Sequence, residues 1–134
     1  MGKLDGRVAV ITSGSTGIGR GIGAAFLAEG AKIVINGRDP EKGARALSEL
    51  DAGDRGHFIR GDVTIREDVD RVVSGAAEKF GRIDILVNNA GQGLCAPVES
   101  IDLSDCRAVM ELNVFAVLSA MQAVIPIMRQ QGAA

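Results

Sequence analysis

The sequence contains no tyrosine and no tryptophan, and it has only one histidine and two cysteines. Cys95 and Cys106 lie far apart, and neither is near His57. This spacing does not match the ligand patterns of metal sites. We therefore expect no metal, two reduced structural thiols, and a histidine at the surface or at the edge of a strand.

Neither sign of charge dominates, because the formal net charge is only -2 and the charges are mixed along the chain. Binding to nucleic acid or to a membrane surface would require a basic stripe or patch, which the sequence lacks. The start shows no signal-peptide layout. The longest mainly apolar segment, Val114 to Met128, contains Ser119, Gln122 and Pro126 and is short for a bilayer span. We expect a cytoplasmic protein without nucleic-acid or membrane partners.

The apolar residues occur in short runs rich in Val and Ile. With 134 residues, 46% of them hydrophobic, the chain is long enough for one domain over residues 1–134 with a sizeable core. The predicted strands are Val8–Thr12, Lys32–Asn36, His57–Asp62 and Ile83–Asn88. Because these runs do not alternate with polar residues, we expect strands buried on both faces, as in a parallel sheet.

Between the strands, apolar residues recur with a helical period, and glycines follow two of these segments as predicted C-terminal caps. The stripes are Ile18, Ile22 and Phe26 before Gly30, and Val69, Val72, Val73, Ala76 and Phe80 before Gly81. Asp39 and Pro40 predict the start of a further helix. Strands and helices therefore alternate, which predicts an α/β fold with a Rossmann-like doubly wound parallel sheet.

A cluster of small residues separates the first strand from the first helix. Ser13, Gly14 and Ser15 permit a sharp turn, and we expect Gly17 and Gly19 to let the helix pack closely against the sheet. Backbone N–H groups at the positive end of the helix would then face a phosphate. A tight turn without a ligand would use the same residues, so the loop alone does not show whether a phosphate binds there.

Four motifs together resemble the short-chain dehydrogenase/reductase family. "TSGSTGIG" is similar to the family's T-G-x-x-x-G-I-G signature. "GDVT" at 61–64 resembles the family's segment that flanks adenine, and "NNAG" at 88–91 resembles its fourth-strand motif. Asn113, in "ELNVFAV", falls where the family has a catalytic asparagine. Ser13 departs from the pattern by standing where the family's first glycine is usual. The resemblance covers the whole chain and implies the strand order 3-2-1-4.

The resemblance and the loop together give a set of expected dinucleotide-binding residues. They are Ser13, Gly14, Ser15, Thr16, Gly17, Ile18, Gly19, Arg38, Asp62, Val63, Asn89, Ala90 and Gly91. At the end of the second strand, Gly37 fills the position of the acidic residue that binds a ribose 2'-hydroxyl, and Arg38 follows it. NADP(H) is therefore favoured over NAD(H), and Asp39 is expected to cap a helix. A solvated Arg38 without a ligand remains the alternative.

Asn113 borders an apolar helical stripe formed by Val109, Leu112, Ala116, Ala120, Ala123 and Ile127. A polar amide in that place needs hydrogen-bond partners. It could be a core asparagine whose hydrogen bonds are satisfied by neighbouring backbone. The resemblance instead implies a residue that holds a water molecule in a proton relay. Both interpretations stay open, and so does a purely hydrogen-bonding role of Asn88 and Asn89 at the end of the fourth strand.

The absent tyrosine bears directly on function, because the family's general acid is the Tyr of a Tyr-x-x-x-Lys motif, preceded by a substrate-orienting Ser. Neither can be placed in this sequence, which ends "IPIMRQQGAA" and resembles the N-terminal half of a family member, before a fifth strand. Without a proton donor near the carbonyl oxygen, we expect the chain alone to be nearly inactive.

The last strand, "IDILVNN", is apolar on both faces, yet the expected order gives it a neighbour on one side only. An open apolar edge favours self-association or pairing with a complementary fragment.

Three functions remain possible for this sequence. They are the NAD(P)-binding part of an oxidoreductase acting on a carbonyl or alcohol substrate, an inactive dinucleotide-binding module, and a structural flavodoxin-like domain that binds no nucleotide.

Overall fold

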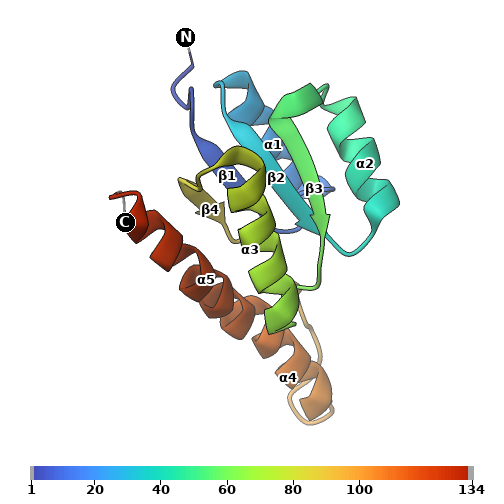
Figure 1. The fold of residues 1–134 in the computed structure, drawn as a ribbon. Coiled ribbons are helices and arrows are strands. Elements are labelled where there is room, and N and C mark those ends of the chain that lie inside the picture. The colour runs from blue at the N-terminus through green and yellow to red at the C-terminus, as the bar shows by residue number, and fades with distance from the viewer. Residues whose placement is uncertain (1, 133–134) are drawn as a thin grey trace.

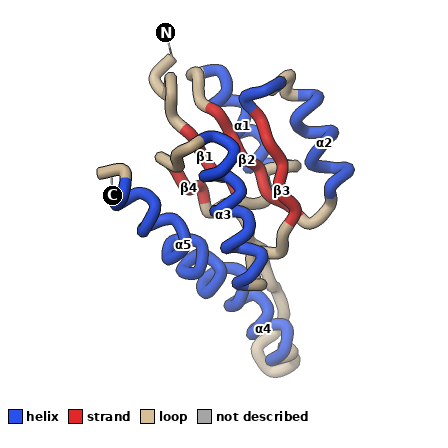
Figure 2. The backbone as a smooth tube through the Cα atoms, viewed as in Figure 1, coloured by secondary structure: helices blue, strands red, loops and turns tan. Residues whose placement is uncertain are grey.

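Four parallel strands form a single sheet in the computed structural model, which describes residues 2–132. They are β1 (Val8–Ile11), β2 (Lys32–Gly37), β3 (Gly56–Arg60) and β4 (Ile85–Val87). Their order is β3-β2-β1-β4, so β1 and β2 are central and β3 and β4 lie at the edges (Figure 2). The predicted parallel sheet with order 3-2-1-4 is confirmed.

Helices cover both faces of this sheet. They are α1 (Gly17–Ala28), α2 (Pro40–Glu49), α3 (Arg66–Phe80), α4 (Leu103–Met110) and α5 (Ala116–Gln130), with a short 3₁₀ turn at Gly53–Arg55. α1 and α2 lie on one face, and α3 and α5 on the other (Figure 1). α4 projects beyond the carboxyl ends of the strands. The chain thus has the three layers of a doubly wound fold.

The helix ends follow the signals in the sequence. Asp39 caps α2, because its Oδ1 accepts hydrogen bonds from the N–H groups of Glu41 at 2.9 Å and Lys42 at 3.4 Å. Gly81 ends α3 in a left-handed conformation with φ of 80°, and Gly30 follows α1 with φ of 91°. These conformations favour glycine, so the predicted caps are confirmed.

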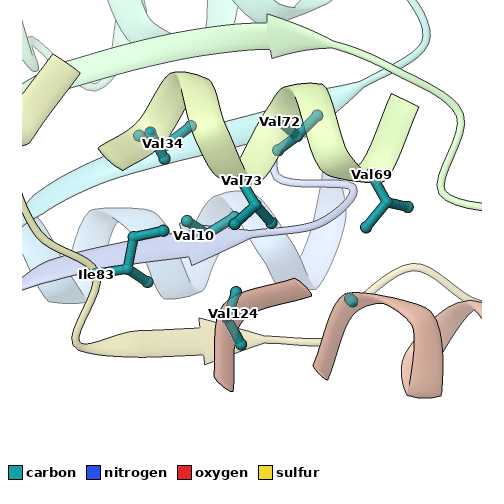
Figure 3. Close-up of a cluster of buried hydrophobic side chains, with 9 residues drawn as sticks. Val10, Val34, Val69, Val72, Val73, Ile83 and Val124 are labelled. Atoms are coloured by element: carbon teal, nitrogen blue, oxygen red, sulfur yellow. The ribbon is translucent and has the colours of Figure 1, made fainter. Parts of the chain in front are cut away.

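The two central strands are buried on both faces. On one face, Val10 and Val34 pack against Val72 and Val73 of α3 and Val124 of α5 (Figure 3). On the other face, the core contains Ile11, Ile33, Ile35, Leu27, Ala46 and Ala52. β3 and β4 are only partly buried, and His57 lies on the edge strand β3 as expected.

The last helical segment is not one regular helix. A π-helical turn at Glu111–Phe115 joins α4 to α5. The predicted apolar stripe is therefore only partly buried: Ala116 and Ala120 are core residues, and Val124 rather than Ala123 is the next fully buried position. A π turn inserts an extra residue into the helix, and such turns occur frequently at functional sites.

By length and composition alone, the helical segment Leu103–Gln130, with 28 residues, could cross a membrane. It is longer than the apolar segment that the sequence suggested. In this structure only 17% of its most apolar window is buried. Its buried residues, among them Ala120 and Val124, belong to the core that α5 shares with α3 and the sheet.

Candidate functional site

A cleft of about 560 Å³ lies at the carboxyl ends of the four strands. Its lining residues come from the loops after β1, β2, β3 and β4 and from the last helical segment: Ser13, Asn36, Gly37, Arg38, Gly61, Asp62, Val63, Thr64, Ala90, Gly91, Gln92, Ala108 and Leu112. Six of the expected dinucleotide-binding residues are among them. In open α/β sheets, ligands bind at this edge, where the loops diverge.

The glycine-rich loop follows β1, and its glycines have different roles. A Cβ on Gly14 would lie 2.6 Å from the Ile35 side chain, and one on Gly19 would meet the Ser13 carbonyl oxygen and the Asn89 side chain. Gly17 has φ of 56° and open space around it. The expectation of close packing is thus correct for Gly19 but wrong for Gly17, whose conformation rather than packing requires glycine.

The first turn of α1 begins directly at this loop. The side chain of its N-cap residue, Thr16, accepts no hydrogen bond from the N–H groups of the first turn. Gly17 and Ile18 are exposed there, Ile18 with 78% of its surface accessible. Uncapped N–H groups at a helix N-terminus attract anions. Neither residue lines the large cleft.

Thr12 and Asn89 join the glycine-rich loop to the end of β4. Thr12 Oγ1 accepts hydrogen bonds from the N–H groups of Asn89 at 3.0 Å and Ala90 at 2.9 Å. Asn89 Nδ2 donates to the Ser13 carbonyl at 3.1 Å. Asn89 therefore makes the strand-linking bonds that were one of its two interpretations. Thr12 begins the "TSGSTGIG" signature but was not predicted as a site residue.

Asn36 connects two loops of the site and was also missed. The residue is 2% exposed, and its Nδ2 donates to the carbonyl oxygens of Ile59 at 3.3 Å and Gly61 at 2.9 Å. Its own carbonyl accepts from the Gly14 N–H at 3.0 Å. The only sequence signal was a polar residue at the end of an otherwise apolar strand.

The loop after β3 is held by two carboxylates. Asp62 Oδ1 accepts from the Thr64 N–H at 2.9 Å and hydroxyl at 2.6 Å, while the Asp62 N–H donates to Asp68 Oδ2 at 2.8 Å. That N–H, together with the Arg71 guanidinium, lowers the pKa of Asp68. Asp68 thus stays ionised at neutral pH and fixes the segment that brings Asp62 and Val63 to the cleft.

The end of β2 presents a cation, Arg38, whose neighbouring carboxylate, on Asp39, is engaged in capping α2. Arg38 is exposed, lines the cleft and follows Gly37, which supplies no side chain. Asp39 directs its Oδ1 to the N–H groups of α2, as the sequence predicted. The arrangement leaves Arg38 available to an anionic ligand.

Asn113 lies in the π-helical turn and contacts the loop after β4. Its Oδ1 accepts from the Gln92 N–H at 2.9 Å, and its Nδ2 donates to the Gln92 carbonyl at 2.7 Å. A Cβ on Gly91 would lie 3.3 Å from that Oδ1. Asn113 therefore bonds backbone, as the first of its two interpretations stated, but it is exposed and not the core residue of that interpretation. Its bonds place Gln92 at the wall of the cleft.

Within residues 2–132, no three His, Cys, Asp or Glu side chains come together as metal ligands. Cys95 is exposed and Cys106 is partly buried, and both are free thiols. Among the described side chains that line the cleft, Arg38 is the cation, and Asn36, Gln92 and several small residues stand beside Asp62 and the apolar Val63 and Leu112.

Residues 7–134 match the family described as short chain dehydrogenase. Among similar curated proteins is the rhamnolipids biosynthesis 3-oxoacyl-(acyl-carrier-protein) reductase of Pseudomonas aeruginosa, which is 37% identical over 132 residues, 98% of this chain and 52% of that protein. Similar solved structures include the P. aeruginosa RhlG/NADP active-site complex, with 38% identity, a TM-score of 0.88, and coverage of 95% of this chain and 50% of that one. The structure of a 3-ketoacyl-(acyl-carrier-protein) reductase from Brucella melitensis complexed with NADH has 36% identity and a TM-score of 0.92. The match covers 98% of this chain and 53% of that one. The chain spans about half the length of the curated relatives it matches.

Proposed function

Because this chain belongs to the short-chain dehydrogenase family, we propose that its cleft binds a nicotinamide dinucleotide and forms the cofactor-binding part of an oxidoreductase. The observation that carries the proposal is the convergence of four loops on one cleft. Ser13, Arg38, Asp62, Val63 and Gly91 meet there from distant parts of the sequence. Similar solved structures are complexes with NADP and with NADH.

The residues present fit the parts of such a cofactor. The pyrophosphate would lie over the glycine-rich loop, where Gly17 leaves open space beside the uncapped first turn of α1. The adenosine would lie between Arg38 and the Asp62–Val63 segment, and the nicotinamide end near Ala90 and Gly91. When bound, the cofactor supplies the hydride that is exchanged with a carbonyl or alcohol substrate.

We favour NADP(H) over NAD(H) at this site. A 2'-phosphate is an anion that Arg can bind through two parallel hydrogen bonds. Arg38 lines the cleft, and Gly37 places no carboxylate next to it. An acidic residue there would bind the 2'-hydroxyl of NAD and repel the phosphate.

In the complete enzyme, the role proposed for Asn113 is to take part in proton transfer, as the family resemblance implies. Its observed bonds to Gln92 hold the wall of the cleft in place. The 134-residue sequence has no tyrosine to donate a proton to a carbonyl oxygen. We therefore expect this chain to bind cofactor without appreciable turnover.

We further propose that the chain associates with a second copy of itself. Val114, Phe115, Leu118 and Met121 form an outer apolar face on the last helical segment, and each is between 39% and 53% exposed. Within the described residues 2–132, β4 pairs with β1 alone, so its other edge is open there. A face of this kind on one helix can pack against its own copy about a two-fold axis.

The function is tested by titrating NADPH and NADH into the purified chain while following cofactor fluorescence. We expect saturable binding of NADPH that Arg38→Ala weakens about 10- to 100-fold, the range of a charge-assisted contact. Arg45→Ala provides a matched control, because Arg45 is an exposed arginine that does not line the cleft. Failure of the wild-type chain to bind either cofactor would refute the proposed function.

A further inference from the structure

A second, smaller cleft of about 180 Å³ continues the site toward α2. Its lining residues are Ser13, Ser15, Thr16, Gly37, Arg38, Asp39 and Lys42. Ser13, Gly37 and Arg38 also line the large cleft, so the two spaces adjoin. A dinucleotide bound in the large cleft would therefore have room for a substituent on this side.

Two cations border the smaller cleft. Within residues 2–132, the side chains of Arg38 and Lys42 take part in no ion pair or hydrogen bond, whereas five other arginines form salt bridges. The one carboxylate at this cleft, on Asp39, accepts bonds from the Glu41 and Lys42 N–H groups. The local charge therefore favours an anion, and the N-terminus of α2 adds to the positive field.

Ser15 provides an independent observation. Its Oγ is enclosed, and it is the buried side-chain polar atom that has no hydrogen-bond partner in the described part of the chain. It lies against Gly37, where a Cβ would come within 3.0 Å of it. An enclosed hydroxyl without a partner is unfavourable, and such groups commonly bond to water or a ligand. This hydroxyl borders the same cleft as the two cations.

This inference rests on the proposed function. We propose that Lys42, which lines the same cleft as Arg38, is a second ligand of the 2'-phosphate of NADP and that Ser15 Oγ donates to the same group. A phosphate monoester carries close to two negative charges at neutral pH, so two cations balance it better than one. Arg38 supplies a planar pair of donors, and Lys42 supplies a mobile point charge from the first turn of α2. Lys42 thus determines cofactor specificity without contact with the nicotinamide.

The test compares dissociation constants of NADPH and NADH for the wild-type chain, Lys42→Gln and Arg45→Gln. Arg45 lies on the same helix, is exposed and lines neither cleft. We expect Lys42→Gln to weaken NADPH about fivefold, below the usual range of charged hydrogen bonds because Lys42 is exposed. NADH affinity should not change, and Arg45→Gln should affect neither cofactor.

Competition with 2',5'-ADP and 5'-AMP isolates the phosphate, because these probes differ only in that group. The wild-type chain should prefer 2',5'-ADP, and Lys42→Gln and Ser15→Ala should each reduce the preference, without a loss of thermal stability in Ser15→Ala. If NADPH binds the wild type but its affinity is unchanged in Lys42→Gln, the role of Lys42 is refuted while the proposed function stands. If neither cofactor binds the wild type, both are refuted.

Discussion

Ser13 adopts a left-handed backbone conformation with φ of 51°, at the position where the sequence departs from the family's glycine. This region costs a residue with a side chain about 1–2 kcal/mol, while glycine loses about 0.4–1 kcal/mol more backbone entropy on folding. We therefore expect Ser13→Gly to raise the free energy of unfolding by up to about 1 kcal/mol. Urea denaturation measures this difference.

Asp51 is a matched control for Ser13, because it also has a positive φ, of 52°, and lies away from both clefts. Asp51→Gly should give a comparable gain in stability and leave NADPH affinity unchanged. A loss of stability in Ser13→Gly alone would show that its side chain contributes more than the strained backbone costs.

At the residue scale, the sequence predicted six of the residues that line the cleft but not the bonds that hold it. Ser13 of the loop signature, Arg38 and the segments at 62–63 and 90–91 lie around one cavity, whereas Gly14 to Gly19 do not line it. Thr12 and Asn36 were missed, because their partners are carbonyl and N–H groups of other strands. Such contacts depend on how strands pair in space, and no local pattern contains that information.

At the scale of elements, Asp84, just before β4, forms a hydrogen bond with the first residue of β1. Its carboxylate accepts from the Val8 N–H at 2.9 Å and from Arg82 at 2.6 and 2.8 Å, and its side chain is 4% exposed. Burial opposes ionisation, but the hydrogen bonds from Arg82 and Val8 more than offset it, so the pKa of Asp84 lies below its ordinary value.

We expect Asp84→Asn to lower the free energy of unfolding at neutral pH by about 2 kcal/mol, the scale of a charged hydrogen bond. Because the folded-state pKa is lowered, this stabilisation is fully present above the ordinary Asp pKa of about 4. It is lost as the pH falls through the lower folded-state value. Thermal unfolding between pH 7 and pH 3 should therefore show a flatter acid limb in the variant.

Asp70→Asn is the control for Asp84, because Asp70 forms an exposed i,i+4 pair with Arg66 and is 56% exposed. Exposed pairs of this kind contribute about 0.3–0.5 kcal/mol. Equal losses of stability in the two variants would contradict the structural role given to Asp84.

Most of the elements could be predicted from the sequence because their signals are local. Apolar runs, the Asp39 cap and the Gly81 stop lie within or next to the elements they define. The π-helical turn at Glu111–Phe115 was not predicted. Its place coincides with the bonds of Asn113 to Gln92, 21 residues away in sequence, which helical periodicity does not reveal.

At the scale of the whole molecule, the outer apolar face of Val114, Phe115, Leu118 and Met121 predicts self-association. We expect a dimer in sedimentation velocity at micromolar concentration, and Leu118→Glu should shift the chain to monomer because it places a charge in the interface. Leu118 is 50% exposed, so the change should not unfold the domain. Circular dichroism checks that the variant remains folded.

Val98→Glu is the control for that experiment, since Val98 is 89% exposed and lies in the loop before α4, outside the outer apolar face. It should leave the sedimentation coefficient unchanged. A wild-type chain that stays monomeric, or a Leu118→Glu variant that still dimerises, would rule out this face as the contact.

The bonds of Asn36 reach across the site, from the Gly14 N–H on one side to the Gly61 carbonyl on the other. The loops that would face pyrophosphate and adenine are therefore ordered together when the sheet forms. Their loss of conformational freedom belongs to folding rather than to binding. A dinucleotide would meet a preorganised surface, so association need not wait for loop closure, and less of its interaction free energy would be spent on ordering the protein.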